Sequence, residues 1–270
     1  MLSHLDFETL LVTLAMARVL QSLGLVFVWK LHQNYRPARD WAIGSALIAA
    51  GTLGIATSNV MTDDIATSVT FVSVMAILFG ALIFNSGILR ASAIPQRIWL
   101  GCGIALISTL LFGWFSYVDP SAGNRMAVFG AAMMLFDLYT AARLLAVKRQ
   151  ALSAMLRVIG VILLIDAASF PLRITSVYLS GNIIPEFSIG SSLAVIFATI
   201  ATAGVLMMTL ALTALTSLID LTERQKLQEQ LNRSERYVRA ILESASDVAI
   251  IAAERDLLIT VFNTGAERML

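Results

Sequence analysis

The sequence predicts an all-α membrane protein: a bundle of seven transmembrane helices whose last helix continues into the cytosol and leads to the first strands of a further domain. Three observations predict this class. Of the 270 residues, 58% are hydrophobic and 14% are charged, whereas soluble domains carry about 45–50% apolar and about 25% charged residues. Seven apolar segments have the ~20 residues that a helix needs to cross a bilayer. After residue 218 the composition becomes polar, but helix-forming residues continue.

Charge and cysteine content exclude several functions. A formal net charge of +1 gives no basic excess of the kind that binds nucleic acid. The single cysteine, Cys102, excludes an internal disulfide and a cysteine-based metal cluster. His4 and His32 lie at opposite ends of the first apolar segment, so they cannot bind one metal ion together. No glycine-rich nucleotide-binding motif is present, and we expect no catalytic residue, metal site or cofactor within the chain.

The transmembrane helices and their orientation follow from the apolar segments and the connections between them. The expected helices are residues 9–29, 41–60, 65–89, 98–118, 126–147, 155–179 and 187–218. Lys and Arg gather in the first, third and fifth connections, and cytoplasmic loops accumulate these residues. The N-terminus is therefore expected outside and the C-terminus in the cytosol. The four tryptophans are expected near the membrane interfaces: Trp29, Trp41, Trp99 and Trp114.

Three ionisable residues lie near the middle of predicted helices: Arg18 in the first, Asp137 in the fifth and Asp166 in the sixth. An ionisable group at membrane depth is costly and usually faces a partner or a cavity. We therefore expect these residues to form a cluster with a net charge of minus one, in which one carboxylate binds a proton or a second cation. The cluster is either a site for a ligand or a proton, or a structural ion pair that holds the first helix against the fifth and sixth.

Other polar and helix-breaking residues surround this cluster. Arg173, seven residues after Asp166, is the candidate second cation. Pro171 lies between them and is expected to kink the sixth helix, because proline removes a backbone donor. Asn85 is expected to form a hydrogen bond between neighbouring helices.

The seventh helix is expected to continue past the membrane, because residues 219–246 contain no Gly or Pro and are rich in helix formers. Five apolar residues follow the 4-7-3-4 spacings of a parallel coiled-coil seam: Leu227, Leu231, Val238, Ile241 and Ala245. Because the repeat is shorter than three heptads, this segment is either a helix that pairs with a second copy or a solvated linker helix. Residues 248–252 and 257–262 are expected to form two strands, and Asn263 is a good N-cap for a following helix.

The stretches "SERYVRAILESASDVAII" and "LITVFNTGAERML" resemble the entry of PAS domains in bacterial membrane sensors. In that family a helix ending in a Glu-Ser-Ala-like tripeptide leads into the first strand, and an Asn ends the second strand. The resemblance covers residues 236–270. It implies a chain truncated early in the PAS domain, since such a domain needs on the order of a hundred residues. The turn departs from the family, which favours Asp-Gly where this chain has Arg255-Asp256-Leu257.

Residues 5–90 are similar to the N-terminal membrane region of bacterial diguanylate cyclases and some sensor histidine kinases. The residues that carry this likeness are Trp29-Lys30, Trp41 and Gly87-Ile88-Leu89-Arg90. The two resemblances imply a multi-pass protein of the bacterial inner membrane with three parts: a sensor or anchor domain (1–218), a signalling helix (219–246) and an incomplete PAS start (247–270).

The function implied is a sensory input module that passes a signal through the seventh helix and a dimeric linker helix to a PAS domain and a downstream output. A diguanylate cyclase, which makes cyclic di-GMP, is favoured over a histidine kinase as that output. The alternative is a passive membrane anchor and dimerisation scaffold, with sensing done by the PAS domain. The expected partners are the lipid bilayer, a second copy through the cytosolic helix and, for a sensor, a small apolar or amphipathic ligand in the bundle.

Overall fold

The computed structural model describes residues 7–58, 60–147, 153–179, 192–245, 247–254 and 258–269. The chain divides into two compact units, Met1–Leu215 and Thr216–Leu270. The boundary between these two units, after Leu215, lies close to residue 218, where the membrane domain was expected to end. The elements, in chain order, are α1 (Phe7–Leu31), α2 (Arg36–Ser58), α3 (Asp63–Ala91), α4 (Ile98–Tyr117), α5 (Ala122–Leu145), α6 (Ser153–Leu179), α7 (Ser192–Ser244), β1 (Ile251–Ala253), β2 (Ile259–Phe262) and α8 (Thr264–Met269).

The first unit is a bundle of helices. Within the described residues, α1 to α7 are the seven helices that are long and apolar enough to cross a membrane. This confirms the predicted all-α bundle and gives the chain the architecture of a multi-pass membrane protein. Large apolar side chains are exposed along α1 and α4, as at Leu20 and Leu110, which suits helices whose outer faces contact lipid.

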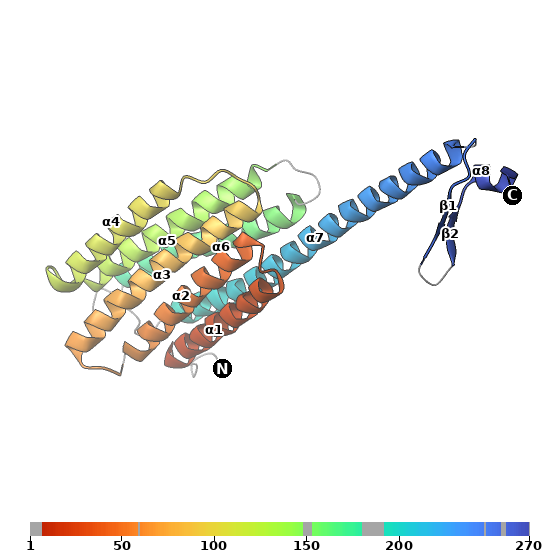
Figure 1. Ribbon diagram of the computed structural model, residues 1–270. Coiled ribbons are helices and arrows are strands. Elements are labelled where there is room, and N and C mark those ends of the chain that lie inside the picture. Colours follow the sequence, from red (N-terminus) through yellow and green to blue (C-terminus); the bar gives the residue numbers. More distant parts are fainter. Residues whose placement is uncertain are drawn as a thin grey trace. The chain divides into compact units, whose positions relative to one another are not determined.

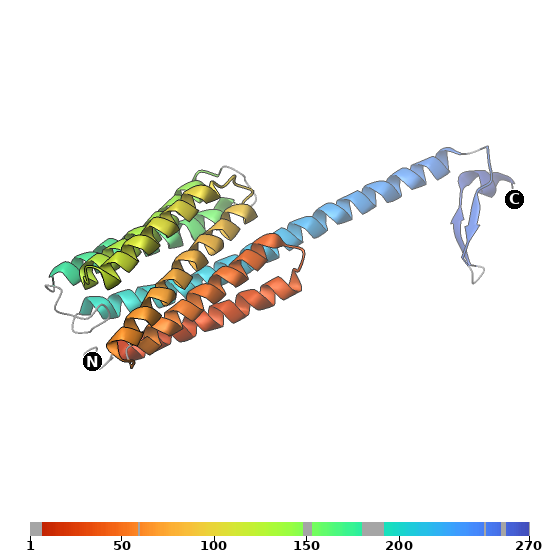
Figure 2. The same ribbon diagram turned by 60° about the vertical axis from the view of Figure 1, so that its left-hand side comes forward.

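The bundle contains two groups of three helices (Figures 1 and 2). In one group α2 packs against α1 and α3, and in the other α5 packs against α4 and α6. The groups meet where α3 contacts α4 and α5, and the part of α7 within the bundle lies between them (Figure 2). Glycines allow α2 and α3 to approach closely, because a Cβ atom at Gly44 would lie 2.7 Å from the carbonyl oxygen of Gly80.

Charged and capping residues at the helix ends explain where several helices begin and end. The first turn of α3 carries Asp63 and Asp64 and its last turn carries Arg90, which complements the helix dipole at both ends. The N-cap of α5 is Ser121, whose hydroxyl accepts a hydrogen bond of 3.3 Å from the backbone N–H of Asn124.

Two prolines lie inside helices. The prediction that the second helix begins at Trp41 is wrong, because α2 begins at Arg36. Pro37 then occupies the first turn, where the missing N–H costs no intrahelical bond. In α6 the helix is continuous through Pro171, and the hydroxyl of Thr175 donates to the Pro171 carbonyl oxygen at 2.8 Å. The kink expected at Pro171 stays a prediction.

The second unit begins within α7, a helix of 53 residues. The prediction that the seventh helix continues past residue 218 is confirmed. In this unit β1 and β2 pair antiparallel, with Ile251 opposite Phe262 and a register shift after Ala252. The two predicted strands and the helix that follows them are therefore present in the expected order. The turn residues 255–257 lie outside the described part of the chain.

Candidate functional site

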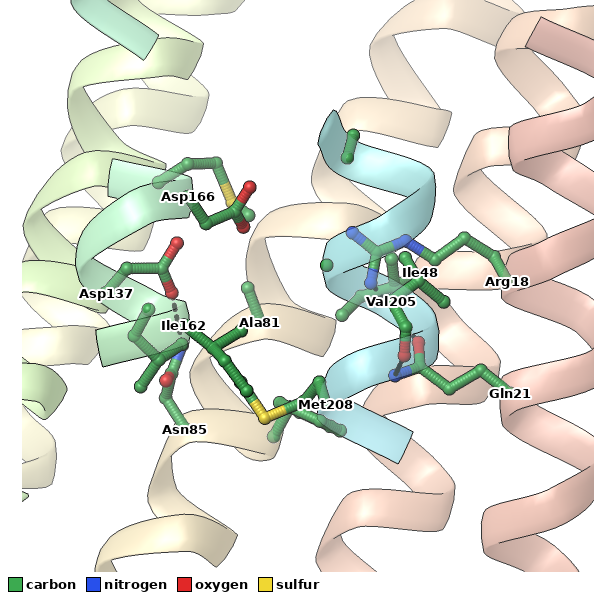
Figure 3. Close-up of a pocket in the computed structure, with 15 residues that line it drawn as sticks. Arg18, Gln21, Ile48, Ala81, Asn85, Asp137, Ile162, Asp166, Val205 and Met208 are labelled. Carbon is green, nitrogen blue, oxygen red and sulfur yellow. Dashed lines mark hydrogen bonds between the residues drawn. The ribbon is translucent and has the colours of Figure 1, made fainter. Parts of the chain in front are cut away.

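A charged cavity lies in the interior of the helix bundle (Figure 3). Its volume is about 50 Å³, and helices α1, α2, α3, α5, α6 and α7 all contribute lining residues. Five of these residues are polar or charged: Arg18, Gln21, Asn85, Asp137 and Asp166. The others are apolar or small: Ile48, Ala81, Phe84, Met133, Ile162, Leu163, Ala201, Gly204, Val205 and Met208. The structure therefore brings the three predicted midplane charges to one place.

Arg18 and Gln21 connect the cavity to α7. Residues three apart on a helix share a face, and the guanidinium of Arg18 donates to the side-chain oxygen of Gln21 at 3.2 Å. The Gln21 amide in turn donates to the backbone carbonyl of Val205 in α7 at 3.4 Å. Gln21 is buried. Apart from its spacing from Arg18, no feature of the sequence distinguishes this glutamine.

Asn85 and Asp137 join α3 to α5 at the cavity wall. The Asn85 amide donates to Asp137 Oδ1 at 3.2 Å, so the expected interhelical hydrogen bond of Asn85 is confirmed. The side chains are 6% and 3% exposed, respectively. Their second oxygens, Asn85 Oδ1 and Asp137 Oδ2, are buried without a hydrogen-bond partner. Both oxygens can accept a donor or a cation, and leaving a buried polar atom unpaired is costly.

Arg18 faces both carboxylates without direct contact. In Figure 3 its guanidinium points across the cavity toward Asp166 and Asp137. Among the described side chains, however, Arg18 makes no ion pair within 4.0 Å with either residue. The side chain of Arg173, the expected second cation, lies outside the described part of the structure.

A second polar contact between helices, that of Asp40 with Arg90, was not predicted from the sequence. Asp40, in the first turns of α2, is 5% exposed and pairs with Arg90 near the end of α3. Next to it, Trp41 is fully buried within the bundle, and its place near a membrane interface stays a prediction. A Cβ atom at Gly87 would lie 2.7 Å from Trp41 Cδ1. Three residues that carry the family resemblance, Trp41, Gly87 and Arg90, therefore pack α2 against α3.

Asn263 organises the second unit. Its side-chain oxygen accepts from the N–H of Ala266 at 2.9 Å, which confirms the predicted N-cap of α8, and from the N–H of Ile250 at 2.8 Å. Its amide also donates to the carbonyl oxygens of Leu242 and Ala245, at 3.2 and 2.9 Å, at the end of α7. One buried side chain therefore connects the end of α7, the first strand and the start of α8.

The predicted seam of α7 is exposed in the single chain. Leu227, Leu231, Val238 and Ile241 are each about half exposed, and Ala245 is partly exposed. No group of three His, Cys, Asp or Glu side chains that could hold a metal ion occurs among the described residues. No protein-family model matches the chain, and no curated protein or solved structure is significantly similar to it.

Proposed function

We propose that this chain is the membrane-embedded sensory input module of a bacterial signal-transduction protein, in the inner membrane with its C-terminus in the cytosol. The observation that supports this proposal most strongly is that α7 lines the charged cavity and continues as one helix to Ser244. A change in the cavity that moves α7 is therefore carried along a continuous helix. The hydrogen bonds of Asn263 then connect the end of that helix to the strands that follow.

The length of α7 suits this role. At 1.5 Å per residue its 53 residues correspond to roughly 80 Å, whereas the hydrocarbon core of a bilayer is about 30 Å thick. More than half of the helix therefore extends beyond the membrane core. Its exposed apolar seam suits pairing with a second copy, and small sliding or rotation of paired helices is a known way to switch an output.

The downstream parts of the proposal come from the resemblances. We infer that β1, β2 and α8 begin a PAS domain, and that the output beyond it is a diguanylate cyclase rather than a histidine kinase. Apolar residues of the hairpin, including Ile251 and Ile259, are exposed here, as expected for strands that a complete PAS domain would cover. Enzyme activity then belongs to that output and not to the residues of this chain.

A passive anchor and dimerisation scaffold is the second candidate, and specific contacts favour it. The Asn85–Asp137 and Gln21–Val205 hydrogen bonds hold helices together without any ligand. On this account the cavity charges only fix helix positions, and the PAS domain is the sensor.

The test replaces the cavity charges in the full-length parent protein. The variant carries Arg18→Leu, Asp137→Leu and Asp166→Leu. A matched control changes exposed apolar residues of the same three helices at nearly the same depth: Leu20→Ala, Leu138→Ala and Ile165→Ala. Output activity is measured in membranes at equal folded yield. An output locked on or off in the charge variant alone supports the sensory function, whereas wild-type output in both variants supports the anchor.

A further inference from the structure

Among the described residues that line the bundle cavity, the charges do not balance. Arg18 supplies one positive charge, and Asp137 and Asp166 supply two negative charges if both are ionised. In a low-dielectric interior an uncompensated charge is expensive, so such a site takes up a proton or a counter-ion. One carboxylate oxygen, Asp137 Oδ2, is buried without a hydrogen-bond partner, and a proton or a bound cation would satisfy it.

The surroundings of the two carboxylates show which one carries the excess charge. Asp137 and Asp166 lie on one side of the cavity and Arg18 reaches toward them from the other side (Figure 3). The hydrogen-bond donor to Asp137 is the neutral amide of Asn85. Three helices pack against α5: α6 presents Asp166 to the cavity, α3 presents Asn85, and α4 contributes no lining residue. Within the described part of the chain, Asp137 therefore has a neutral hydrogen-bond donor, one buried oxygen without a partner and no cation in contact.

The size of the cavity limits what can bind there. A water molecule needs about 10–15 Å³ measured in this way, so about 50 Å³ has room for roughly three to five water-sized species. Drug-sized ligands occupy pockets of about 300–1,000 Å³. The apolar or amphipathic ligand expected for a sensor does not fit the cavity in this conformation. A proton, or one monovalent metal ion with its waters, does fit.

We propose that this cavity binds one exchangeable monovalent cation at Asp137, either a proton on its carboxylate or a sodium ion at Asp137 Oδ2. Binding makes and breaks no bond other than that to the cation, which comes from the solvent and returns to it. Gly204 and Val205 of α7 line the same cavity, so binding or release of the cation changes the position of α7. That last step rests on the proposed sensory function, whereas cation binding does not.

The experiment uses the whole chain in lipid nanodiscs and infrared spectroscopy, which distinguishes a carboxylic acid from a carboxylate by its C=O stretching band. Wild type is titrated with pH in sodium chloride and in choline chloride, and its unfolding temperature is measured in both salts. A proton site gives an acid band of one group per chain at neutral pH that disappears at alkaline pH. A sodium site gives no such band, but sodium and not choline raises the unfolding temperature. If neither effect is seen in wild type, the proposal is wrong.

Variants assign the effect to Asp137. Asp137→Asn is expected to abolish the acid band or the sodium effect, whereas Asp63→Asn, at an exposed position of α3, leaves both unchanged. An effect that survives in Asp137→Asn contradicts the assignment. If that variant does not fold, Asn85→Ala decides: losing the hydrogen bond to Asp137 Oδ1 shifts the acid band or weakens the sodium effect, and no change contradicts the assignment.

A last comparison separates binding from signalling. If wild type shows the cation effect but Asp137→Asn leaves the output of the full-length parent unchanged, the site exists and the proposed sensory function is wrong. If the output changes but no cation effect is found, the cavity takes part in signalling without holding a cation.

Discussion

Two glycines of the bundle should respond in opposite ways to the same added methyl group. A Cβ atom at Gly51 would lie 2.4 Å from the backbone oxygen of Ser73 and 2.6 Å from Ile77 Cγ1, whereas a Cβ atom at Gly204 meets nothing within 4 Å. Ordinary contact begins near 3.4 Å, so Gly51→Ala must move α2 away from α3 by about 1 Å. Gly204→Ala only places a methyl group in the cavity.

The magnitudes follow from these distances. Alanine in place of glycine favours a helix by about 0.5–1 kcal/mol at both positions, and overpacking costs typically ~1–3 kcal/mol at Gly51 alone. Gly204→Ala should therefore be neutral or slightly stabilising, and Gly51→Ala should be less stable than Gly204→Ala by about 1–3 kcal/mol. Unfolding of the purified chain in mixed micelles, followed by circular dichroism, measures this difference. Equal stability of the two variants would refute the close approach of α2 and α3.

Three further predictions concern other parts of the structure. Asn263→Ala should lower the stability of the second unit by about 1–2 kcal/mol through loss of a helix cap. It should also speed amide exchange at Ile250, whose N–H donates to this side chain. Unchanged exchange at Ile250 would contradict this role of Asn263. Arg90→Gln should destabilise the bundle by about 1–3 kcal/mol in chemical unfolding, less than for a fully buried pair, because the Arg90 side chain is 40% exposed. Adding Asp40→Asn should recover part of that loss, and no recovery would contradict the pairing. Burial raises the pKa of Tyr35 from 10.0 to about 12. The unfolded chain therefore loses this proton at a lower pH than the folded chain, and the free energy of unfolding should fall between about pH 10 and 12. Tyr35→Phe should remove that part of the pH dependence measured by thermal unfolding.

The sequence was sufficient for features that depend on composition along the chain. Apolar length predicted the seven helices, and the absence of Gly and Pro after residue 218 predicted the continuation of α7. The start of α2 was missed because the expected helix was limited to the apolar segment 41–60, although proline, here Pro37, is well tolerated in a first helical turn. The cap at Asn263 was predicted because capping is local. Its bonds to the end of α7 were not, because they join residues 18 or more positions apart.

In the cavity, too, conspicuous single residues could be selected from the sequence, whereas contacts between distant residues could not. Arg18, Asp137 and Asp166 were selected because a charge inside an apolar helix is conspicuous in any sequence. Gln21 was not selected, because one uncharged polar residue in a helix does not show which face it occupies or what lies opposite. Asp40 was missed for a different reason: it lies in a charged connection, where most acidic residues are solvated, and only the packing of α2 on α3 buries it against Arg90.

The central claim, that the state of the cavity moves α7, is tested most directly by cysteine cross-linking in the full-length parent. With Cys102→Ser as background, single cysteines are placed along residues 224–244, and the yield of cross-linked dimer is measured in membranes with and without Asp137→Asn. The account predicts that cross-linking in the wild-type background peaks at positions 227, 231, 238 and 241, and that the pattern shifts in phase when Asp137 is changed. An identical pattern in both backgrounds would contradict the claim that the cavity controls α7, and no cross-linking at any position would contradict the pairing of the signalling helices.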